Sequence, residues 1–188
     1  ERDVIMPLVA HHQVYLYQID NYQKDSFWFQ IKNAAAVLQA SFRYLEFYEE
    51  ADQTIFKRVN ESRILLPGKV LIHDSAEIDK TAKIGPNVTI GAGAKIGAGV
   101  RISNAIILDG AEVMPSTYIS NSIIGWNSVI GRWARIVGLS GSEKAPSENE
   151  GITILGVGVT VEAEVFISNC IVLPYKNLAE NHHGEILL

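Results

Sequence analysis

The sequence has 188 residues, which allows one domain or two small ones, and 47% of them are hydrophobic, which is ample for a packed core. Acidic and basic residues are scattered and sum to a formal net charge of −5, so no basic patch favours a nucleic-acid partner. No apolar run is long enough to span a membrane, and the single cysteine, Cys170, excludes a disulfide scaffold and favours a cytoplasmic location.

Residues 1–50 have the composition expected of an α/β domain. A short helix or a turn is expected from Asp3 to Val9, with Pro7 inside it. Two segments rich in strand-forming residues, 14–19 and 27–31, predict strands.

An amphipathic helix is predicted over residues 34–49. Asn33 is a good N-cap, because its side chain can accept a hydrogen bond from the first turn. The apolar residues behind it recur at three- and four-residue spacing: Ala34, Val37, Leu38, Phe42 and Leu45. Two strands and one helix bury little surface, so we expect residues 1–50 to be the tail of a larger domain whose earlier part is absent, or to pack on something else.

Residues 51–67 are interpreted as a linker, and a six-residue repeat follows from residue 68. Each block opens on an isoleucine and has a small or medium-sized residue at its fifth position. The repeat is clearest at five openings: Ile78, Ile84, Ile90, Ile96 and Ile102. A period of six fits neither a helix nor a plain strand, and it predicts a parallel β-helix, a triangular prism with one hexad per face. The opening residue is expected to fill the narrow interior, which also requires the small fifth residue.

The repeat continues to Ile136 with two shifts of one residue, after Ile102 and after Ile119. Three near-copies of Ile-Ser-Asn, beginning at Ile102, Ile119 and Ile167, predict asparagines stacked in successive turns. Five glycines that directly follow an opening residue are expected to relax the backbone where the chain turns: Gly85, Gly91, Gly97, Gly125 and Gly131.

The segment 139–151 interrupts the repeat. It is polar and contains Gly and Pro, so we expect it to protrude as a loop, either without a role or as a contact to a partner. Its candidate partner-contacting or regulatory residues are Gly141, Ser142, Glu143, Lys144 and Glu148. The prism is expected to resume and to end at Pro174, through Ile154, Val159, Ala163, Val165 and Ile171. The apolar end, Ile186 to Leu188, is expected to dock.

The sequence predicts no catalytic, cofactor-binding or metal-binding residue. His73 is the one histidine within the repeat, and it could act as the general base of a β-helix acyltransferase, but a solvated residue of the first coil is the preferred interpretation. His182 and His183 are adjacent and have no third ligand nearby. The glycine run from Gly91 to Gly99 is explained by the repeat rather than by phosphate binding.

Several strings in this sequence resemble one family. The segment Phe27-Trp-Phe-Gln-Ile-Lys32, followed by a predicted helix, a linker and the repeat, is similar to the end of the nucleotidyltransferase domain of sugar-nucleotide pyrophosphorylases. The similarity is to the alpha-type GDP-mannose pyrophosphorylases, and four further strings support it: Ala105-Ile-Ile-Leu-Asp-Gly110, Ser122-Ile-Ile-Gly-Trp-Asn127, Ile152-Thr-Ile-Leu-Gly156 and Ile171-Val-Leu-Pro174.

The resemblance implies a mainly β fold, a left-handed parallel β-helix from 68 to 188 preceded by the α/β tail of a nucleotidyltransferase domain. It also implies a reaction, GTP plus mannose 1-phosphate to GDP-mannose plus pyrophosphate. Trp28 and Gln30 would lie near the substrate, and Gln30 stands where active members have an aspartate that helps to hold Mg²⁺. A neutral amide contributes no charge to a hard cation, so catalysis is expected to be lost or weakened.

The resemblance therefore implies a regulatory alpha-type subunit. Such a subunit would sense GDP-mannose, form homo-oligomers, and assemble with a catalytic beta-type subunit that carries the Mg²⁺, with loop 139–151 reaching into its partner. No cofactor is expected in this segment. An active sugar-phosphate nucleotidyltransferase is the nearest alternative, and a hexapeptide acyltransferase or a subunit of the translation-initiation exchange factor is a more distant one.

Overall fold

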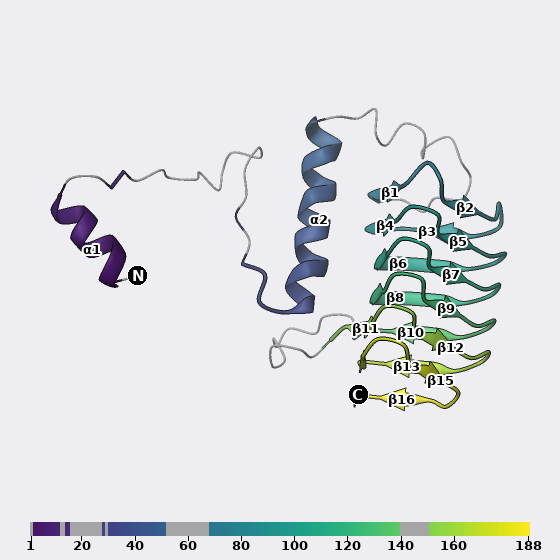
Figure 1. Ribbon diagram of the computed structural model, residues 1–188. Helices are drawn as coiled ribbons and strands as arrows, with labels where there is room; N and C mark the ends of the chain where they lie inside the picture. Colours follow the sequence, from purple (N-terminus) through teal and green to yellow (C-terminus); the bar gives the residue numbers. More distant parts are fainter. Residues whose placement is uncertain (1, 12–13, 16–27, 29, 52–67, 140–150) are drawn as a thin grey trace.

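The computed structural model describes residues 2–11, 14–15, 28, 30–51, 68–139 and 151–188, and it shows two helices followed by a stacked β-helix (Figure 1). The first helix, α1 (Arg2–Ala10), contains Pro7, as predicted. The second, α2 (Ala34–Ala51), begins behind Asn33, whose side-chain oxygen accepts a hydrogen bond from the amide of Ala36 at 2.8 Å. Neither of these helices is long and apolar enough to cross a membrane, a result that covers the described residues.

The β-helix has three faces of parallel strands, and we refer to them as faces 1, 2 and 3. Face 1 comprises β2 (Glu77–Ile78), β5 (Lys95–Ile96), β7 (Glu112–Val113), β9 (Val129–Ile130), β12 (Thr160–Val161) and β15 (Asn177–Leu178). Face 2 comprises β3 (Lys83–Ile84), the first half of β6 (Arg101–Ile107), the first half of β8 (Tyr118–Ile124), β10 (Arg135–Val137), β13 (Phe166–Ser168) and β16 (His182–His183).

Face 3 comprises β1 (Val70–Ile72), β4 (Val88–Ile90), the second halves of β6 and β8, β11 (Thr153–Leu155), β14 (Ile171–Val172) and β17 (Ile186–Leu187). Each strand of an inner coil pairs with the strands of the coils above and below it, and the strands of the first and last coils have one such partner each. Ile78 is in register with Ile96, and Ile96 with Val113, so successive coils take 18 and then 17 residues. The predicted parallel β-helix is therefore confirmed, whereas its left hand stays a prediction from the resemblance.

The prism interior is filled as the hexads predict. Of the five predicted openings, Ile84, Ile90, Ile96 and Ile102 are buried, and Ile78, in the first coil, packs against the same cluster from its edge. The fifth positions hold small residues, including Thr117 and Ser128. Both are buried, and their hydroxyls donate hydrogen bonds to backbone carbonyl groups. A narrow interior thus accepts small polar side chains when the backbone satisfies them.

The two shifts in the repeat occur at the corner between faces 2 and 3. There β6 and β8 run across the corner, and Asn104 and Asn121 take positive φ angles of 46° and 47°. Of the stacked asparagines predicted from the sequence, Asn104 and Asn121 lie in successive turns, whereas Asn169 lies one coil further on, with Gly138 between it and Asn121. The Asn87 side-chain amide donates to the Asn104 side-chain oxygen at 3.0 Å, and Asn169, with φ 52°, accepts from the amide of Leu139 at 2.9 Å. Asparagine tolerates the left-handed conformation, which explains its recurrence at this corner.

The glycines that follow the opening residues are needed for a different reason from the one expected. Of the five, Gly85 has a φ in the left-handed range, whereas Gly91 and Gly97 do not. A Cβ atom at Gly91 would lie 2.7 Å from the backbone nitrogen of Asp109, and one at Gly97 would lie 2.8 Å from that of Pro115. These glycines are required because the next coil approaches the backbone closely.

The helix α2 lies beside face 3 (Figure 1) and packs on its outer surface. Leu38 is buried against Ile106, Ile123 and Ile152, with Phe42 packed at the edge of the same cluster. Of the residues expected on the buried face of α2, Val37 is exposed instead, because the helix turns it away from the prism. The helix buries its apolar stripe on the outward side chains of the β-helix.

Beyond the segment 139–151 the expected register is wrong on face 3. Leu155 and Val172 occupy the interior, whereas Ile154 and Ile171, which were expected there, point outward. Ile154 packs toward α2. Ala163 lies on an exposed turn, whereas Val159 and Val165 are buried as expected. The error arises because successive side chains of a strand point to opposite sides of the sheet. Where two neighbouring residues are both apolar, the sequence does not show which of them points into the interior.

The prism also continues past Pro174. Strands β15, β16 and β17 form another coil, in which Leu178 pairs with Val161 and is buried. Ile186 and Leu187 form the edge strand β17, beside β14, and Leu187 packs against the core. The side chains of Ile186 and Leu188 are exposed, and docking of this end on another subunit stays a prediction. A short turn at Pro174 and Tyr175 is compatible with stacking because the proline amide is not needed in the ladder.

The two strands expected before α2 are not present in the described residues. Val14 and Tyr15 belong to no strand, and neither do Trp28, Gln30 and Ile31. The rest of the segments 14–19 and 27–31 lies outside the described residues. A strand exists through pairing with a neighbour, and no described strand pairs with these residues.

Candidate functional site

The structure does not assemble the residues predicted to lie near a substrate. Trp28 is 70% exposed, Gln30 is also exposed, and neither lies in a regular element. The predicted partner-contacting residues lie outside the described residues: Gly141, Ser142, Glu143, Lys144 and Glu148. The site calls at all of these positions stay predictions.

The histidines in the β-helix have structural contacts. His73 is exposed, and its Nδ1 lies 3.2 Å from the backbone amide of Ser75, from which it accepts, and 2.9 Å from the Ser75 hydroxyl. His182 pairs in register with Ile167 at the last coil, and its Nδ1 lies 3.0 Å from the Glu185 carboxylate. No three His, Cys, Asp or Glu side chains come together as a metal site among the residues described, so we derive no metal-dependent step from them.

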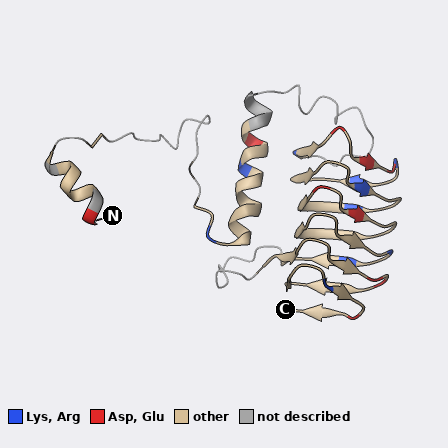
Figure 2. Cartoon of the chain, viewed as in Figure 1, with Lys and Arg blue, Asp and Glu red and all other residues tan. Residues whose placement is uncertain are grey.

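The outer surfaces of the three faces are the remaining candidates, and they differ in charge. In Figure 2 the strands nearest α2 carry almost no charged residues, whereas red and blue segments gather on the side of the prism away from it. Face 3 is apolar and is covered by α2 through Ile106, Ile123 and Ile154. Faces 1 and 2 carry the charged residues.

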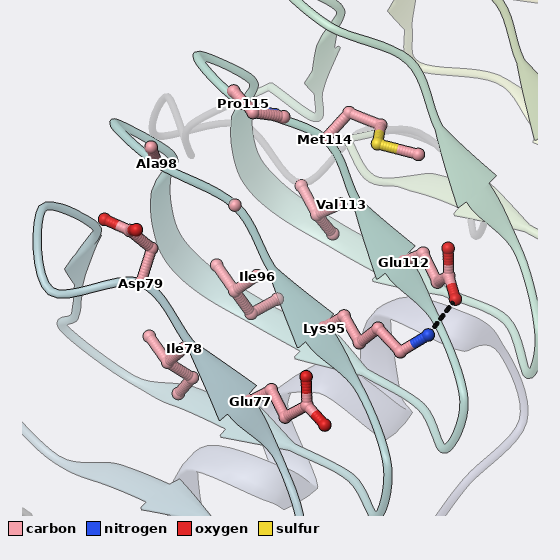
Figure 3. A pocket seen from close by; sticks show the side chains of 11 residues that line it. Glu77, Ile78, Asp79, Lys95, Ile96, Ala98, Glu112, Val113, Met114 and Pro115 are labelled. Carbon is pink, nitrogen blue, oxygen red and sulfur yellow. Dashed lines mark hydrogen bonds and ion pairs between the residues drawn. The ribbon is translucent and has the colours of Figure 1, made fainter.

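Face 1 has a shallow hollow of about 420 Å³ across its first three coils (Figure 3). Glu77, Lys95 and Glu112 stand in one outward row, in register with one another. The Lys95 ammonium donates to the Glu112 carboxylate at 2.6 Å, and this contact raises the pKa of Lys95. Nearby, the Thr81 hydroxyl and amide hydrogen-bond the Asp79 carboxylate and lower its pKa.

The chemistry of this hollow is that of a contact surface. Lys95 and Glu112 are paired with each other, and Asp79 is held by Thr81 in its own turn. Met114 and Pro115 also line the hollow. The hydroxyl–carboxylate contact beside the hollow, from Thr81 to Asp79 at 2.6 Å, closes a local turn, and we derive no catalytic step from it.

Face 2 carries an outward row that the sequence analysis missed. We call this row the cationic–aromatic column, and it contains Lys83, Arg101, Tyr118, Arg135 and Phe166. The guanidinium carbon of Arg135 lies 5.9 Å from the ring centroids of both Tyr118 and Phe166. The signal was available in part, because four members directly precede an expected opening isoleucine, whereas Ile167, which follows Phe166, was not expected to be one.

A large aromatic residue stands at the corner between faces 1 and 2. Trp133 is 65% exposed and has a φ of 61°, in the region that favours glycine or asparagine. The equivalent turn one coil earlier has Ser116, with φ 64°, and two coils earlier Gly99, with φ 67°. The bulky Trp133 is therefore exposed to solvent at a position where a glycine would adopt the backbone conformation with less strain.

Comparison with known proteins identifies the relatives of this chain. The family model of the GMPPB C-terminal domain matches residues 66–187. The whole chain aligns with the mannose-1-phosphate guanylyltransferase regulatory subunit alpha of Dictyostelium discoideum at 37% identity and with that of Homo sapiens at 36%, covering 44% and 47% of those proteins. It also aligns over its full length with the mannose-1-phosphate guanyltransferase alpha-B of Xenopus laevis, at 38% identity and 46% of that protein.

The chain thus spans about half the length of the curated relatives it matches. Among solved structures, a GDP-perosamine N-acetyl transferase from Caulobacter crescentus covers 71% of this chain, and the chain covers 58% of it, at 15% identity and a TM-score of 0.38. That likeness adds nothing on function. The match over residues 66–187 carries the assignment, and the chain belongs to the GMPPB C-terminal domain family.

Proposed function

We propose that this chain is the C-terminal portion of an alpha-type, regulatory subunit of a mannose-1-phosphate guanylyltransferase. The parent complex would convert GTP and mannose 1-phosphate to GDP-mannose and pyrophosphate. The observation that carries the proposal is the alignment of the whole chain, including the residues before the family match, with proteins named as regulatory subunits alpha. Gln30 supports the regulatory assignment, because a neutral amide is a poor ligand for Mg²⁺.

In this proposal the β-helix is a rigid scaffold for assembly. Its closed, isoleucine-lined interior fixes the outer faces, which would then carry the contacts to other subunits. The subunit would bind GDP-mannose through the domain that precedes the prism and would assemble with a catalytic beta-type subunit in the cytoplasm. The segment 139–151 is the proposed contact to that subunit, because it is polar and interrupts an otherwise regular repeat.

The test uses the whole alpha-type subunit reconstituted with a catalytic beta-type subunit. Deletion of residues 140–150 is expected to leave folding intact and to abolish inhibition of the complex by GDP-mannose. Circular dichroism and thermal unfolding of the deletion variant provide the folding control. Unchanged inhibition in a correctly folded variant would remove the loop from the regulatory role.

A second candidate function is an active nucleotidyltransferase, and one observation favours it. The Xenopus laevis relative is named a mannose-1-phosphate guanyltransferase without the word regulatory. Pyrophosphate release by the isolated alpha-type subunit would decide between the two. Turnover that depends on its own carboxylates would establish the active enzyme, whereas GDP-mannose binding by calorimetry without turnover would support the regulatory subunit.

A further inference from the structure

Face 2 carries cations that have no acidic partner among the described residues. Lys83, Arg101 and Arg135 are exposed in the cationic–aromatic column. The salt bridges within the described part of the chain lie elsewhere, and none of them includes these three side chains. Face 1 differs, because there Lys95 stands in register with Glu112 and is paired with it at 2.6 Å. The described residues thus leave the positive charge of the column uncompensated.

The order of residues in the column works against the stability of the chain. Lys83 lies in register with Arg101 on the neighbouring strand, and like charges placed opposite each other destabilise a sheet. Arg135 lies beside two rings instead, with its guanidinium carbon 5.9 Å from the centroids of Tyr118 and Phe166. An anionic partner would remove the repulsion between Lys83 and Arg101, which gives the unfavourable arrangement a physical reason.

The corner between faces 1 and 2 adds no net positive charge to the column. Lys80 is next to Asp79, which Thr81 holds in its ionised form by lowering its pKa. Arg132 is close to Glu164, whose amide donates to the Arg132 carbonyl at 2.8 Å. Further acids on this side stand in the last two coils: Glu162 and Glu180. The positive charge that a partner would meet is therefore that of the column itself, over its first four coils.

The opposite flank of face 2 is uncharged over the same coils. Ser103 is in register with Ser120, and their hydroxyls lie 3.3 Å apart. Asn104 and Asn121 occupy the corner beyond them. A partner on the column would therefore meet hydroxyl and amide groups on this side, which can hydrogen-bond a polypeptide backbone.

We propose that face 2 binds an extended acidic segment of a different protein, in which an apolar residue separates two acidic ones at alternate positions. Coils are spaced about 4.8 Å apart, and side chains on one side of an extended chain are about 6.8 Å apart. A first acid between Lys83 and Arg101 then places the apolar residue on the exposed ring of Tyr118 and the second acid beside Arg135.

An acidic polypeptide fits this face better than a nucleic acid does. A phosphate backbone that continued past the fourth coil would meet Glu164 and Glu180, and the net charge of −5 opposes binding of a long polyanion. Arg135 already lies beside the rings of Tyr118 and Phe166, so these rings are less available to stack on bases. The inference rests on the β-helix itself and does not depend on the proposed enzymatic role.

Fluorescence anisotropy with the 188-residue chain tests the proposal. The probe is a labelled seven-residue peptide of glutamates with leucine at its centre, and its control has glutamine in place of every glutamate. We expect a dissociation constant on the order of 100 µM at about 50 mM salt for the acidic peptide, and binding at least about tenfold weaker for the control. Equal affinity for the two peptides would overturn the proposal.

Charge-reversal variants locate the site. Arg101→Glu is expected to weaken binding of the acidic peptide at least about tenfold, because it places an acid against the peptide carboxylates. The matched control is Lys95→Glu, which makes the same charge change in the same coil but on face 1 and should leave binding unchanged. Thermal unfolding of each variant verifies folding. Unchanged binding by a folded Arg101→Glu chain would overturn the assignment to face 2.

Lys83→Glu separates binding from stability. It replaces the repulsion with Arg101 by an attraction, so it should raise the unfolding temperature by about 1–3 °C while it weakens peptide binding at least about fivefold. A purely structural role for Lys83 would not move these two measurements in opposite directions. A folded variant with a lowered unfolding temperature and unchanged binding would overturn the proposal.

The other occupants of face 2 are outcomes of the same measurements. A thymidine oligonucleotide of equal charge that displaces the peptide and binds more tightly would overturn the choice of a polypeptide. Sedimentation velocity with and without the peptide tests whether a second copy covers the face, since peptide binding that competes with self-association would overturn the proposal. Binding at least about tenfold tighter after deletion of residues 140–150 would do the same, because it would assign the face to a segment of this chain.

Discussion

Faces 2 and 3 of the prism are built by the same coils, and two strands, β6 and β8, contribute to both. On face 3 the outward residues Ile106 and Ile123 are apolar and lie under α2. On face 2 the outward residues of the same strands, Arg101 and Tyr118, are exposed. The large inward residues of β6 and β8 are isoleucines on both faces. The interior thus fixes the coil, and the outward positions are free to decide what each face contacts.

The largest effect is expected where the two faces do not differ, in the interior. Ile119→Ala removes a fully buried side chain from face 2 and should cost about 2–5 kcal/mol of stability, because the stacked coils cannot close the cavity. Urea unfolding followed by circular dichroism measures it. The neighbouring Tyr118→Ala is the matched outward control and should cost under about 0.5 kcal/mol in the monomer. Equal losses would mean that the inward and outward assignment is wrong.

The next effect distinguishes the covered face from the uncovered one. Leu38→Ala should loosen α2 from face 3 and raise hydrogen exchange of its backbone amides about 30-fold, equivalent to roughly 2 kcal/mol. Leu38 is 4% exposed, whereas Val37 is 37% exposed, so Val37→Ala is the control and should change exchange little. Exchange in the strands of face 2 should be unaffected by either variant. A change there would show that α2 supports the whole prism.

A smaller effect is expected at the start of the same helix. Asn33→Ala removes the hydrogen bond from the side-chain oxygen to the Ala36 amide and should destabilise α2 by about 1 kcal/mol. Asn33→Asp retains the oxygen and should keep most of that stability. Hydrogen exchange of the first turn of α2 measures both variants. An alanine variant with unchanged exchange would indicate that packing on face 3 alone positions the helix.

The smallest effect concerns the exposed charges. The pKa of Lys95 is raised by Glu112, so the stability that this pair contributes is present below the ordinary lysine pKa and is lost only as the pH rises through the raised value. The pKa of Asp79 is lowered by Thr81, so its contribution is present above the ordinary aspartate pKa and is lost as the pH falls through the lowered value.

Between these limits neither group changes its protonation, and stability from these two groups should be independent of pH. Thermal unfolding between pH 6 and pH 8 of Lys95→Gln and Thr81→Val variants, compared with the parent chain, measures this. The contribution of Lys95 should also weaken with added salt, because the pair is exposed to solvent. A variant-dependent slope near neutral pH would point to a different titrating group.

The periodic parts of the chain were accessible from the sequence. The opening residues and the small fifth residues were correct as far as Ile136, and so was the stacking of Asn104 on Asn121. The errors occur where the pattern is locally ambiguous or where the outcome depends on a neighbour. Ile154 next to Leu155 could face either way, and Val37 next to Leu38 likewise. The candidate residues Trp28 and Gln30 rested on resemblance alone, and no described contact surrounds them with a site.

By itself, the sequence determined the stacked prism, because a branched side chain at every sixth step can be buried in only one narrow, repeating shape. It also determined the start of α2, because the Asn33 cap acts within one turn. Only the tertiary structure decided which outward residues meet α2 and which stay exposed. It alone brought Tyr118, Arg135 and Phe166 into one column, because stacking joins residues 17 and 31 positions apart in the chain, and only coil register gives them a common face.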